Sequence, residues 1–222
     1  MASSGIPALD KLLVDGYPDR SSVLVVGPPG IGKEALGYWF TSIGLSQGDF
    51  TIYVTKRSLR DIVRDAAGFG VDYSSRIPFL IARDGGQSKF NINDLAGLSY
   101  SIKEVMKSNQ GRRIRIAMDV ISPLLMLNPS ATVYKFLSQL IEDVKQYDAI
   151  LLASIEESMH DKQVLSAMQE LFDGVLEMRF FEEALSPIPL LRVSKMTGSL
   201  PQQGYFKFVL TRNGMEISAY AK

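Results

Sequence analysis

The chain of 222 residues contains no cysteine, a single histidine and no net charge. Without cysteine it has no disulfide, no thiolate metal site and no cysteine nucleophile, and one histidine excludes a multi-histidine metal centre. Its 24 basic and 24 acidic residues cancel, so no overall field attracts nucleic acid or an anionic membrane. Function must therefore come from a local site built of carboxylates, cations, hydroxyls and backbone groups.

Long apolar runs and linkers are missing as well. No apolar stretch approaches the roughly 18 to 20 residues that span a bilayer, and Met1 to Asp10 lacks the charged and apolar regions of a signal peptide. No Pro/Gly/Ser-rich segment or shift in composition divides the chain. We therefore expect residues 1–222 to form one domain with a full core, located in the cytoplasm and without membrane contact.

What is present is a repeated alternation of short apolar runs with helical patterns. A short helical lead begins at Ile6, and later helices are predicted to begin after Lys33, at Ser58, at Asn93, at Ser130 and at Asp161. The apolar runs between them predict strands at 23–26, 50–55, 78–82, 114–118 and 149–154. Such an alternation is typical of an α/β fold with a mostly parallel, twisted sheet and helices on both faces.

From Val175 onward the pattern changes to short strands alone. They are predicted at 175–180, 190–196, 206–211 and 215–218, and Asn213-Gly214 is a hairpin turn signal between the last two. We therefore expect an antiparallel extension at the C-terminal end of the sheet.

The most specific motif is a glycine-rich loop between the first strand and its helix. Backbone amides of such a loop cradle phosphates, its lysine reaches the β- and γ-phosphates, and a final Ser or Thr ligates Mg²⁺. Here the final position is a glutamate. The predicted phosphate-binding residues, for ATP or ADP, are Gly27, Pro28, Pro29, Gly30, Ile31, Gly32, Lys33 and Glu34.

Asp119 is the candidate acid on the metal side of this site. It follows the predicted strand at 114–118, and ligands of open α/β sheets bind at the carboxyl ends of the strands. A carboxylate there can hold Mg²⁺ through water. The alternative is that Asp119 caps a turn; its place downstream of a phosphate-binding loop favours the metal.

Five segments together resemble KaiC-like proteins of the RecA ATPase superfamily, especially archaeal single-domain members. They are Gly5–Asp10, Gly27–Glu34, Ile92–Leu95, Asp119–Leu125 and Lys195–Gly198. The resemblance covers nearly the whole chain and implies a RecA-like P-loop fold. It also implies ATP binding with Mg²⁺ and a homo-oligomer whose sites lie between subunits.

The chain departs from that family where the γ-phosphate would lie. The family carries two glutamates after the second strand, one of which activates water, and the matching residues here are Lys56 and Arg57. The family's C-terminal Lys-x-Arg pair, which reaches the neighbouring subunit's site, is reduced to Lys195 with Thr197. Glu156 matches the glutamate after the fourth strand and is the remaining catalytic candidate. Loss of a general base removes about 10² to 10⁴-fold in rate, and loss of an arginine finger about 10³ to 10⁵-fold.

Glu34 bears on binding rather than on rate. A carboxylate about 4 Å from a phosphate oxygen, at an effective dielectric constant near 20, costs on the order of 4 kcal/mol. One hypothesis is that Glu34 pairs with Lys33, Lys56 or Arg57 and partly occupies the phosphate site. The other is that Glu34 is a favourable first-turn residue of the helix, with Lys56 and Arg57 as solvated loop charges.

Two further segments are candidate binding surfaces. The apolar run 123–127 is expected to pack in the core, with a subunit or partner contact as the alternative. Arg112, Arg113 and Arg115 are expected at an exposed edge or a salt-bridged turn, and His160 on the surface. The loops lack the basic and stacking residues that track a single strand of DNA.

The sequence therefore predicts a RecA- and KaiC-like P-loop protein that binds ATP or ADP with feeble hydrolysis, or a pseudo-ATPase. Its role would be that of a signalling or interaction module with a protein partner or its own copies. The competing interpretation is an active Mg²⁺-ATPase in which Glu34 ligates the metal. A recombinase paralogue that binds single-stranded DNA is the third and least favoured.

Overall fold

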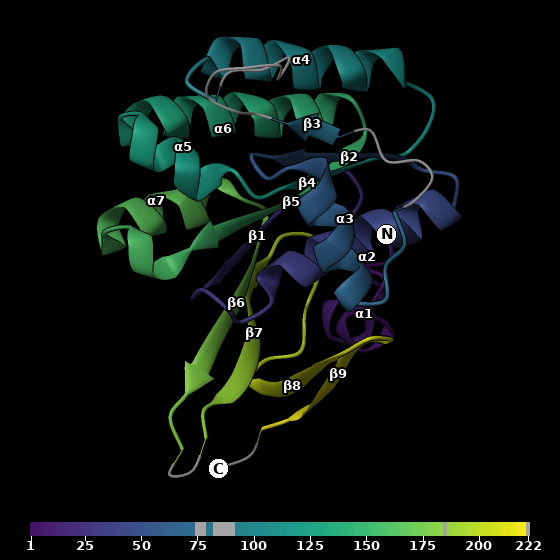
Figure 1. Ribbon diagram of the computed structural model, residues 1–222, viewed down its shortest axis with the longest axis vertical. Helices are drawn as coiled ribbons and strands as arrows, with labels where there is room; N and C mark the ends of the chain where they lie inside the picture. The colour runs from purple at the N-terminus through teal and green to yellow at the C-terminus, as the bar shows by residue number, and fades with distance from the viewer. Residues whose placement is uncertain (74–78, 82–91, 184–185, 221–222) are drawn as a thin grey trace.

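The computed structural model describes residues 1–73, 79–81, 92–183 and 186–220. These residues form a nine-stranded sheet in the order β3-β2-β4-β5-β1-β6-β7-β8-β9, which curls toward its C-terminal strands (Figure 1). The strands are β1 (Ser22–Gly27), β2 (Phe50–Thr55), β3 (Phe79–Ile81), β4 (Ile114–Met118), β5 (Ala149–Glu156), β6 (Gly174–Phe181), β7 (Ile188–Met196), β8 (Phe206–Thr211) and β9 (Gly214–Ala219). The strand order brings the ends of β1, β2, β4 and β5 together at one edge.

Helices cover both faces of the sheet, as the sequence predicted (Figure 1). One face carries α4 (Leu95–Ser108), α5 (Ile121–Leu127), α6 (Ser130–Gln146) and α7 (Lys162–Leu171). The other carries α1 (Pro7–Leu13), α2 (Lys33–Ser46) and α3 (Leu59–Gly68). A short 3₁₀ turn, η1 (Glu157–Met159), follows β5.

The strands are buried on both sides, which explains their continuous apolar runs. In β1, Leu24 and Val26 join the core beneath α4 and α6, whereas Val23 and Val25 join the core beneath α2. Successive side chains point to opposite faces of a strand, so every residue of such a run is buried. The central strands are therefore rigid supports for the loops that follow them.

The start of α3 and the turn between β8 and β9 lie where the sequence predicted them, and the cap of α4 lies one residue later than predicted. Ser58 caps α3 by accepting the amide of Asp61, and the turn before Gly214 joins β8 to β9. The predicted cap Asn93 is wrong: Asp94 caps α4, and its carboxylate accepts the amide of Gly97 at 2.8 Å. Asparagine and aspartate are both favourable N-cap residues, so the sequence alone did not distinguish Asn93 from Asp94.

The C-terminal strands correct one part of the predicted topology. β6 pairs in parallel with β1, and antiparallel pairing begins only between β6 and β7. The expected antiparallel extension is thus β7, β8 and β9. Of the strand predicted at 78–82, residues 79–81 form β3, and Pro78 and Ala82 lie outside the described residues.

The predictions for two further segments are confirmed only in part. The run 123–127 belongs to the helix α5, in which Leu124 is buried but Met126 and Leu127 are 63% and 53% exposed. Arg112 is exposed and Arg113 is ion-paired with Asp19, as predicted. Arg115 is instead fully buried in β4, where Asp49 binds its guanidinium at 2.6 Å. Among the described residues, no helix is long and apolar enough to cross a membrane.

Candidate functional site

The predicted nucleotide residues meet at the carboxyl edge of the parallel strands. Gly27, the last residue of β1, lies opposite Glu156, the last residue of β5, in the parallel register. Asp119 follows β4, and its amide extends the ladder by bonding to the carbonyl of Val54 at 3.1 Å. The phosphate-binding loop, the candidate metal acid and the candidate catalytic acid therefore share one edge of the sheet.

The loop backbone has the form of an anion cradle. Gly30 and Gly32 adopt φ angles of 76° and 88°, which favour glycine, and Gly32 directly precedes α2. A Cβ at Gly32 would lie 2.0 Å from Cδ1 of Leu210, so this glycine also lets β8 pack against the loop. Within the described residues, hydrogen-bond acceptors are lacking for the backbone amides of Gly30, Ile31, Gly32, Lys33 and Glu34.

Lys33 is the buried cation of the site, and protein carboxylates already hold it. Its ammonium group is ion-paired with Glu156 and lies 3.2 Å from Glu34 Oε1, while its side chain is only 3% exposed. It also lies 3.4 Å from the carbonyl oxygen of Pro28. Of the three partners considered from the sequence, Glu34 thus pairs with Lys33.

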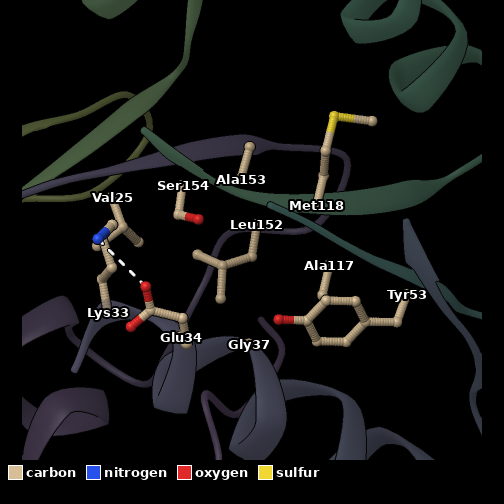
Figure 2. A pocket seen from close by; sticks show the side chains of 10 residues that line it. All are labelled: Val25, Lys33, Glu34, Gly37, Tyr53, Ala117, Met118, Leu152, Ala153 and Ser154. Atoms are coloured by element: carbon tan, nitrogen blue, oxygen red, sulfur yellow. Dashed lines mark ion pairs between the residues drawn. The ribbon is translucent and has the colours of Figure 1, made fainter. Parts of the chain in front are cut away.

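Figure 2 shows the carboxylate of Glu34 turned toward the Lys33 ammonium, with Val25 of β1 and Ser154 of β5 beside them. The small pocket next to them, lined also by Tyr53 and Leu152, holds only about 10 Å³. That volume is about that of one water molecule. A phosphate therefore has no room in this pocket and must bind on the open side of the loop.

Asp119 has one oxygen satisfied and one without a partner. Thr55 donates its hydroxyl to Oδ2 at 3.0 Å, whereas Oδ1 is buried without any hydrogen bond. Burial raises the pKa of Asp119 to about 6, against the opposing effects of the Thr55 hydrogen bond and the Arg57 charge. An orphaned carboxylate oxygen at a strand end is suited to a water-bridged or direct cation.

A cleft of about 400 Å³ opens above these groups. Its charged lining consists of three cations and four carboxylates: Lys33, Lys56 and Arg57 with Glu34, Asp65, Asp119 and Glu156. The residues that replace the family's two glutamates therefore face the same space as the phosphate-binding lysine and the metal-side acid.

Sequence reasoning missed the hydroxyls that organise this edge. Ser122, at the start of α5, accepts the amide of Glu156 at 2.9 Å, and its Oγ lies 3.0 Å from Nε2 of His160. His160 is thus half-buried beside the site rather than simply on the surface, and burial lowers its pKa. A serine or threonine next to a strand end was the available signal, but only the fold brings Ser122 to β5.

Lys195 lies at the opposite edge of the sheet. It pairs in register with Val175, near the start of β6, and its ammonium donates to the carbonyl of Glu170 at 3.0 Å. The start of β6 is far from the carboxyl edge, because β6 runs parallel to β1. Lys195 is therefore not brought together with the chain's own phosphate-binding loop.

The residues present fit a magnesium nucleotide in its essential parts. The free amides of the loop suit phosphate oxygens, and Asp119 Oδ1 suits a cation. Among the described residues no cluster of three or more Asp, Glu and His side chains could hold a metal by itself. Magnesium commonly takes one or two carboxylates and completes its shell with water and phosphate, so Asp119 would be its protein ligand.

Comparison with known proteins identifies the family and similar proteins. A family model described as ATPase: KaiC matches residues 2–222. A UPF0273 protein of Methanopyrus kandleri is 30% identical over 141 residues, which cover 58% of this chain and 56% of that protein. The circadian clock oscillator protein KaiC of Thermostichus vulcanus is 24% identical over 221 residues, covering 97% of this chain and 42% of its own length. The matched regions thus span about half the length of these relatives.

The fold comparison agrees with the sequence comparison. The crystal structure of a KaiC-like protein from Pyrococcus horikoshii superimposes with a TM-score of 0.82 at 20% identity, covering 98% of each chain. The nine-stranded sheet with its phosphate-binding loop is therefore a RecA-type P-loop fold. The chain belongs to the KaiC family of ATPases.

Proposed function

We propose that the chain binds Mg²⁺-ATP or Mg²⁺-ADP at this edge, hydrolyses ATP feebly or not at all, and acts as a nucleotide-dependent interaction or signalling module. The observation that carries the proposal is the pairing of Lys33 with both Glu156 and Glu34. Phosphate must displace or share these carboxylates, which weakens binding without removing the cradle. The loop amides and the Lys33 ammonium would hold the phosphates, and Asp119 would hold the cation.

Weak hydrolysis follows from the positions of the remaining acids. General-base help needs a carboxylate within hydrogen-bond reach of the attacking water. The positions after β2 carry Lys56 and Arg57, and the carboxylate of Glu156 is engaged with Lys33. Thr197 supplies no charge where the family places an arginine. The chain thus keeps groups that bind phosphate and lacks groups that activate water.

An active ATPase is the second candidate, and one observation favours it. Glu34 is 31% exposed and lines the same cleft as Asp119, so the two carboxylates could share one metal ion. In that case Glu34 is a direct ligand in place of the family's hydroxyl, and turnover depends on both acids.

Steady-state phosphate release with an Asp119→Asn control separates the two candidates. The proposal expects release at, or only slightly above, the level of the Asp119→Asn variant. Release well above that level in the parent would establish the ATPase and end the pseudo-enzyme interpretation.

Binding itself is measured by calorimetric titration with Mg²⁺-ATP and Mg²⁺-ADP. Replacing Glu34 by Thr removes one carboxylate from Lys33 and restores the family's hydroxyl, so about 10-fold tighter ATP binding is expected, as for one charged hydrogen bond. Parent protein that binds neither nucleotide would refute the proposal. A Glu34→Thr variant that binds ATP no more tightly than the parent would refute the competition by Glu34.

Assembly into a homo-oligomer is part of the proposal. Lys195 lies at the edge opposite its own loop, so it could reach a phosphate site only in another copy. Light scattering with and without Mg²⁺-ATP tests this: a monomer at all concentrations would contradict it.

A further inference from the structure

The two cations after β2 are the feature that the proposed function leaves unexplained. Lys56 and Arg57 line the cleft that also contains Lys33 and Asp119. Loss of the family's glutamates needs no positive charge in their place, because any neutral residue would remove the base. The chain instead carries two adjacent cations at the carboxyl end of a buried strand.

Arg57 is held in place along one edge of its guanidinium. Nη1 donates to the hydroxyl of Tyr38 at 2.7 Å and to Oδ2 of Asp65 at 2.9 Å. Its backbone amide donates to Oγ1 of Thr55 at 3.1 Å. The side chain is 33% exposed, and its Nε and Nη2 make no hydrogen bond to any residue that the structure describes. The guanidinium is therefore oriented, with donors left over.

A fixed guanidinium with free donors is suited to a phosphate. Arginine presents planar donors that match phosphate oxygens, and a side chain already ordered loses little entropy on binding. Tyr38 and Asp65 lie on α2 and α3, the two helices that flank the cleft on this side. The arrangement thus resembles a prepared anion contact more than a solvated loop charge.

Lys56 adds an unpaired cation to a cleft that four carboxylates, those of Glu34, Asp65, Asp119 and Glu156, also line. It is exposed, and no carboxylate of the described residues lies within ion-pair distance of it. Lys33, by contrast, is neutralised by Glu156 and Glu34. An anion that enters the cleft therefore meets Lys56 and the free edge of Arg57 as its available cations.

The same segment is linked to the metal-side acid. Thr55 donates to Asp119 Oδ2 and accepts the amide of Arg57 through the same hydroxyl oxygen. The carboxylate that would face a cation and the residue that would face a phosphate are thus held by one side chain. A metal-bound terminal phosphate is the kind of ligand that contacts both.

We propose that Lys56 and Arg57 clamp the terminal phosphate of a nucleoside triphosphate, so that the site selects triphosphate over diphosphate. The inference rests on the proposed function, because it concerns the same cleft. Cations that contact the phosphate before reaction tighten ground state and transition state alike, which strengthens binding without raising the rate. The clamp therefore holds the triphosphate in a protein that lacks a base to hydrolyse it.

The test is a set of calorimetric affinities for Mg²⁺ complexes of ATP, ADP and inorganic tripolyphosphate. The variant is Lys56→Gln/Arg57→Gln, and the matched control is Arg60→Gln/Arg64→Gln, which removes two exposed arginines from the adjoining helix. The parent should bind ATP at least about 10-fold more tightly than ADP, as expected for one charged phosphate contact. The variant should lose about 10-fold to 100-fold for ATP and less than about 3-fold for ADP, and the control should match the parent.

Folding is checked by thermal unfolding, since Arg57→Gln leaves Asp65 and Tyr38 without their cation. If the double variant unfolds, the single variants Lys56→Gln and Arg57→Lys are measured in its place, because each keeps a cation beside Asp65. Each should lower the ATP preference in part.

The outcomes separate the clamp from the proposed function. Equal losses for ATP and ADP, or an unchanged preference in folded variants, overturn the clamp while nucleotide binding stands. Parent protein that binds neither nucleotide overturns both. Tripolyphosphate that binds as tightly as ATP supports the clamp and shows that it reads phosphate rather than the nucleoside.

Discussion

Two buried cations, at opposite edges of the sheet, have contrasting surroundings. Arg115 near the start of β4 bonds to Asp49 at 2.6 Å, to Gln47 at 2.7 Å and to the carbonyl of Ser3 at 2.6 Å, and lies 5.0 Å from the ring centroid of Phe40. Lys33, at the carboxyl edge, pairs with Glu34 and Glu156, and Oε2 of Glu156 has no hydrogen-bond partner.

Both cations are buried, and they differ in whether the polar atoms around them all have hydrogen-bond partners. Each nitrogen of the Arg115 guanidinium donates to a fixed acceptor, so the cluster is complete without a ligand. At the carboxyl edge, Asp119 Oδ1 and Glu156 Oε2 are buried without partners, and the loop amides have no acceptors among the described residues. Buried polar groups left unbonded are costly, and these lie at the strand ends where open α/β sheets bind their ligands. The first cluster is complete without a ligand, and the second is the candidate site.

Removing Arg115 should have the largest effect on stability. Arg115→Ala leaves Asp49 and Gln47 without their cation, and breaking a buried ion pair costs about 3 to 5 kcal/mol. Urea unfolding measures this free energy. The matched control is Arg113→Ala, which removes a half-exposed pair with Asp19 and should cost less than about 1 kcal/mol. Equal costs for the two variants would mean that the buried Arg115 cluster stabilises the fold no more than an exposed ion pair does.

Neutralising Asp119 should stabilise the protein at neutral pH. Burial raises its pKa from 3.8 to about 6, so its ionisation opposes folding: the stabilisation present below pH 4 is lost as the pH rises through 6. Asp119→Asn avoids that loss and should gain up to about 3 kcal/mol at pH 8, from roughly two pKa units at 1.36 kcal/mol each.

The gain should vanish near pH 4, where the parent carboxyl is protonated. Urea unfolding at both pH values measures it, with the exposed Asp15→Asn as control. A pH-independent difference would mean that the carboxylate of Asp119 is not strained in the free protein. The same variant should lose any Mg²⁺-dependent rise in melting temperature.

Releasing Lys33 from Glu156 should raise the affinity of the site for Mg²⁺-ATP. Glu156→Gln removes the competing charge, so Mg²⁺-ATP should bind about 10-fold more tightly, as for one charged hydrogen bond. Glu157→Gln, in the exposed turn that follows, is the matched control. Weaker binding in Glu156→Gln would show instead that Glu156 acts on the side of the nucleotide or its metal.

Lys195 should give the smallest effect on stability. Its ammonium bonds only to the exposed carbonyl of Glu170, so Lys195→Ala should change the free energy of unfolding by less than about 0.5 kcal/mol. Its contribution to ATP affinity should appear only at protein concentrations at which the chain self-associates. A loss of affinity in dilute monomer would contradict a role across subunits.

The local elements were predictable because each depends on neighbours in the sequence. The buried runs of β1 and β4, the Ser58 cap and the Asn213-Gly214 turn need only a few consecutive residues to form. The errors arose where a distant partner decided the outcome. Arg115 was expected near the surface because its sequence neighbours are basic, but Asp49, 66 residues away in the chain, gave it a buried partner.

The candidate site divides in the same way. The loop of residues 27–34 and the strand before Asp119 are readable from residue order and spacing, which place them at one edge of a parallel sheet. Thr55 and Ser122 offer only the weak signal of a hydroxyl near a strand end, and Tyr38 and Asp65 offer none. They became part of the site only because the strands and helices that hold them converge there.

The sequence by itself determined the P-loop fold, the edge where phosphate would bind, and the change of charge at Glu34, Lys56 and Arg57. Only the tertiary structure decided which opposite charges meet. Glu156 reaches Lys33 across 123 residues because the parallel register sets Gly27 beside Glu156, and Arg57 is oriented because α2 and α3 bring Tyr38 and Asp65 to it. Ion pairs depend on distance in space, and only the folded chain sets that distance.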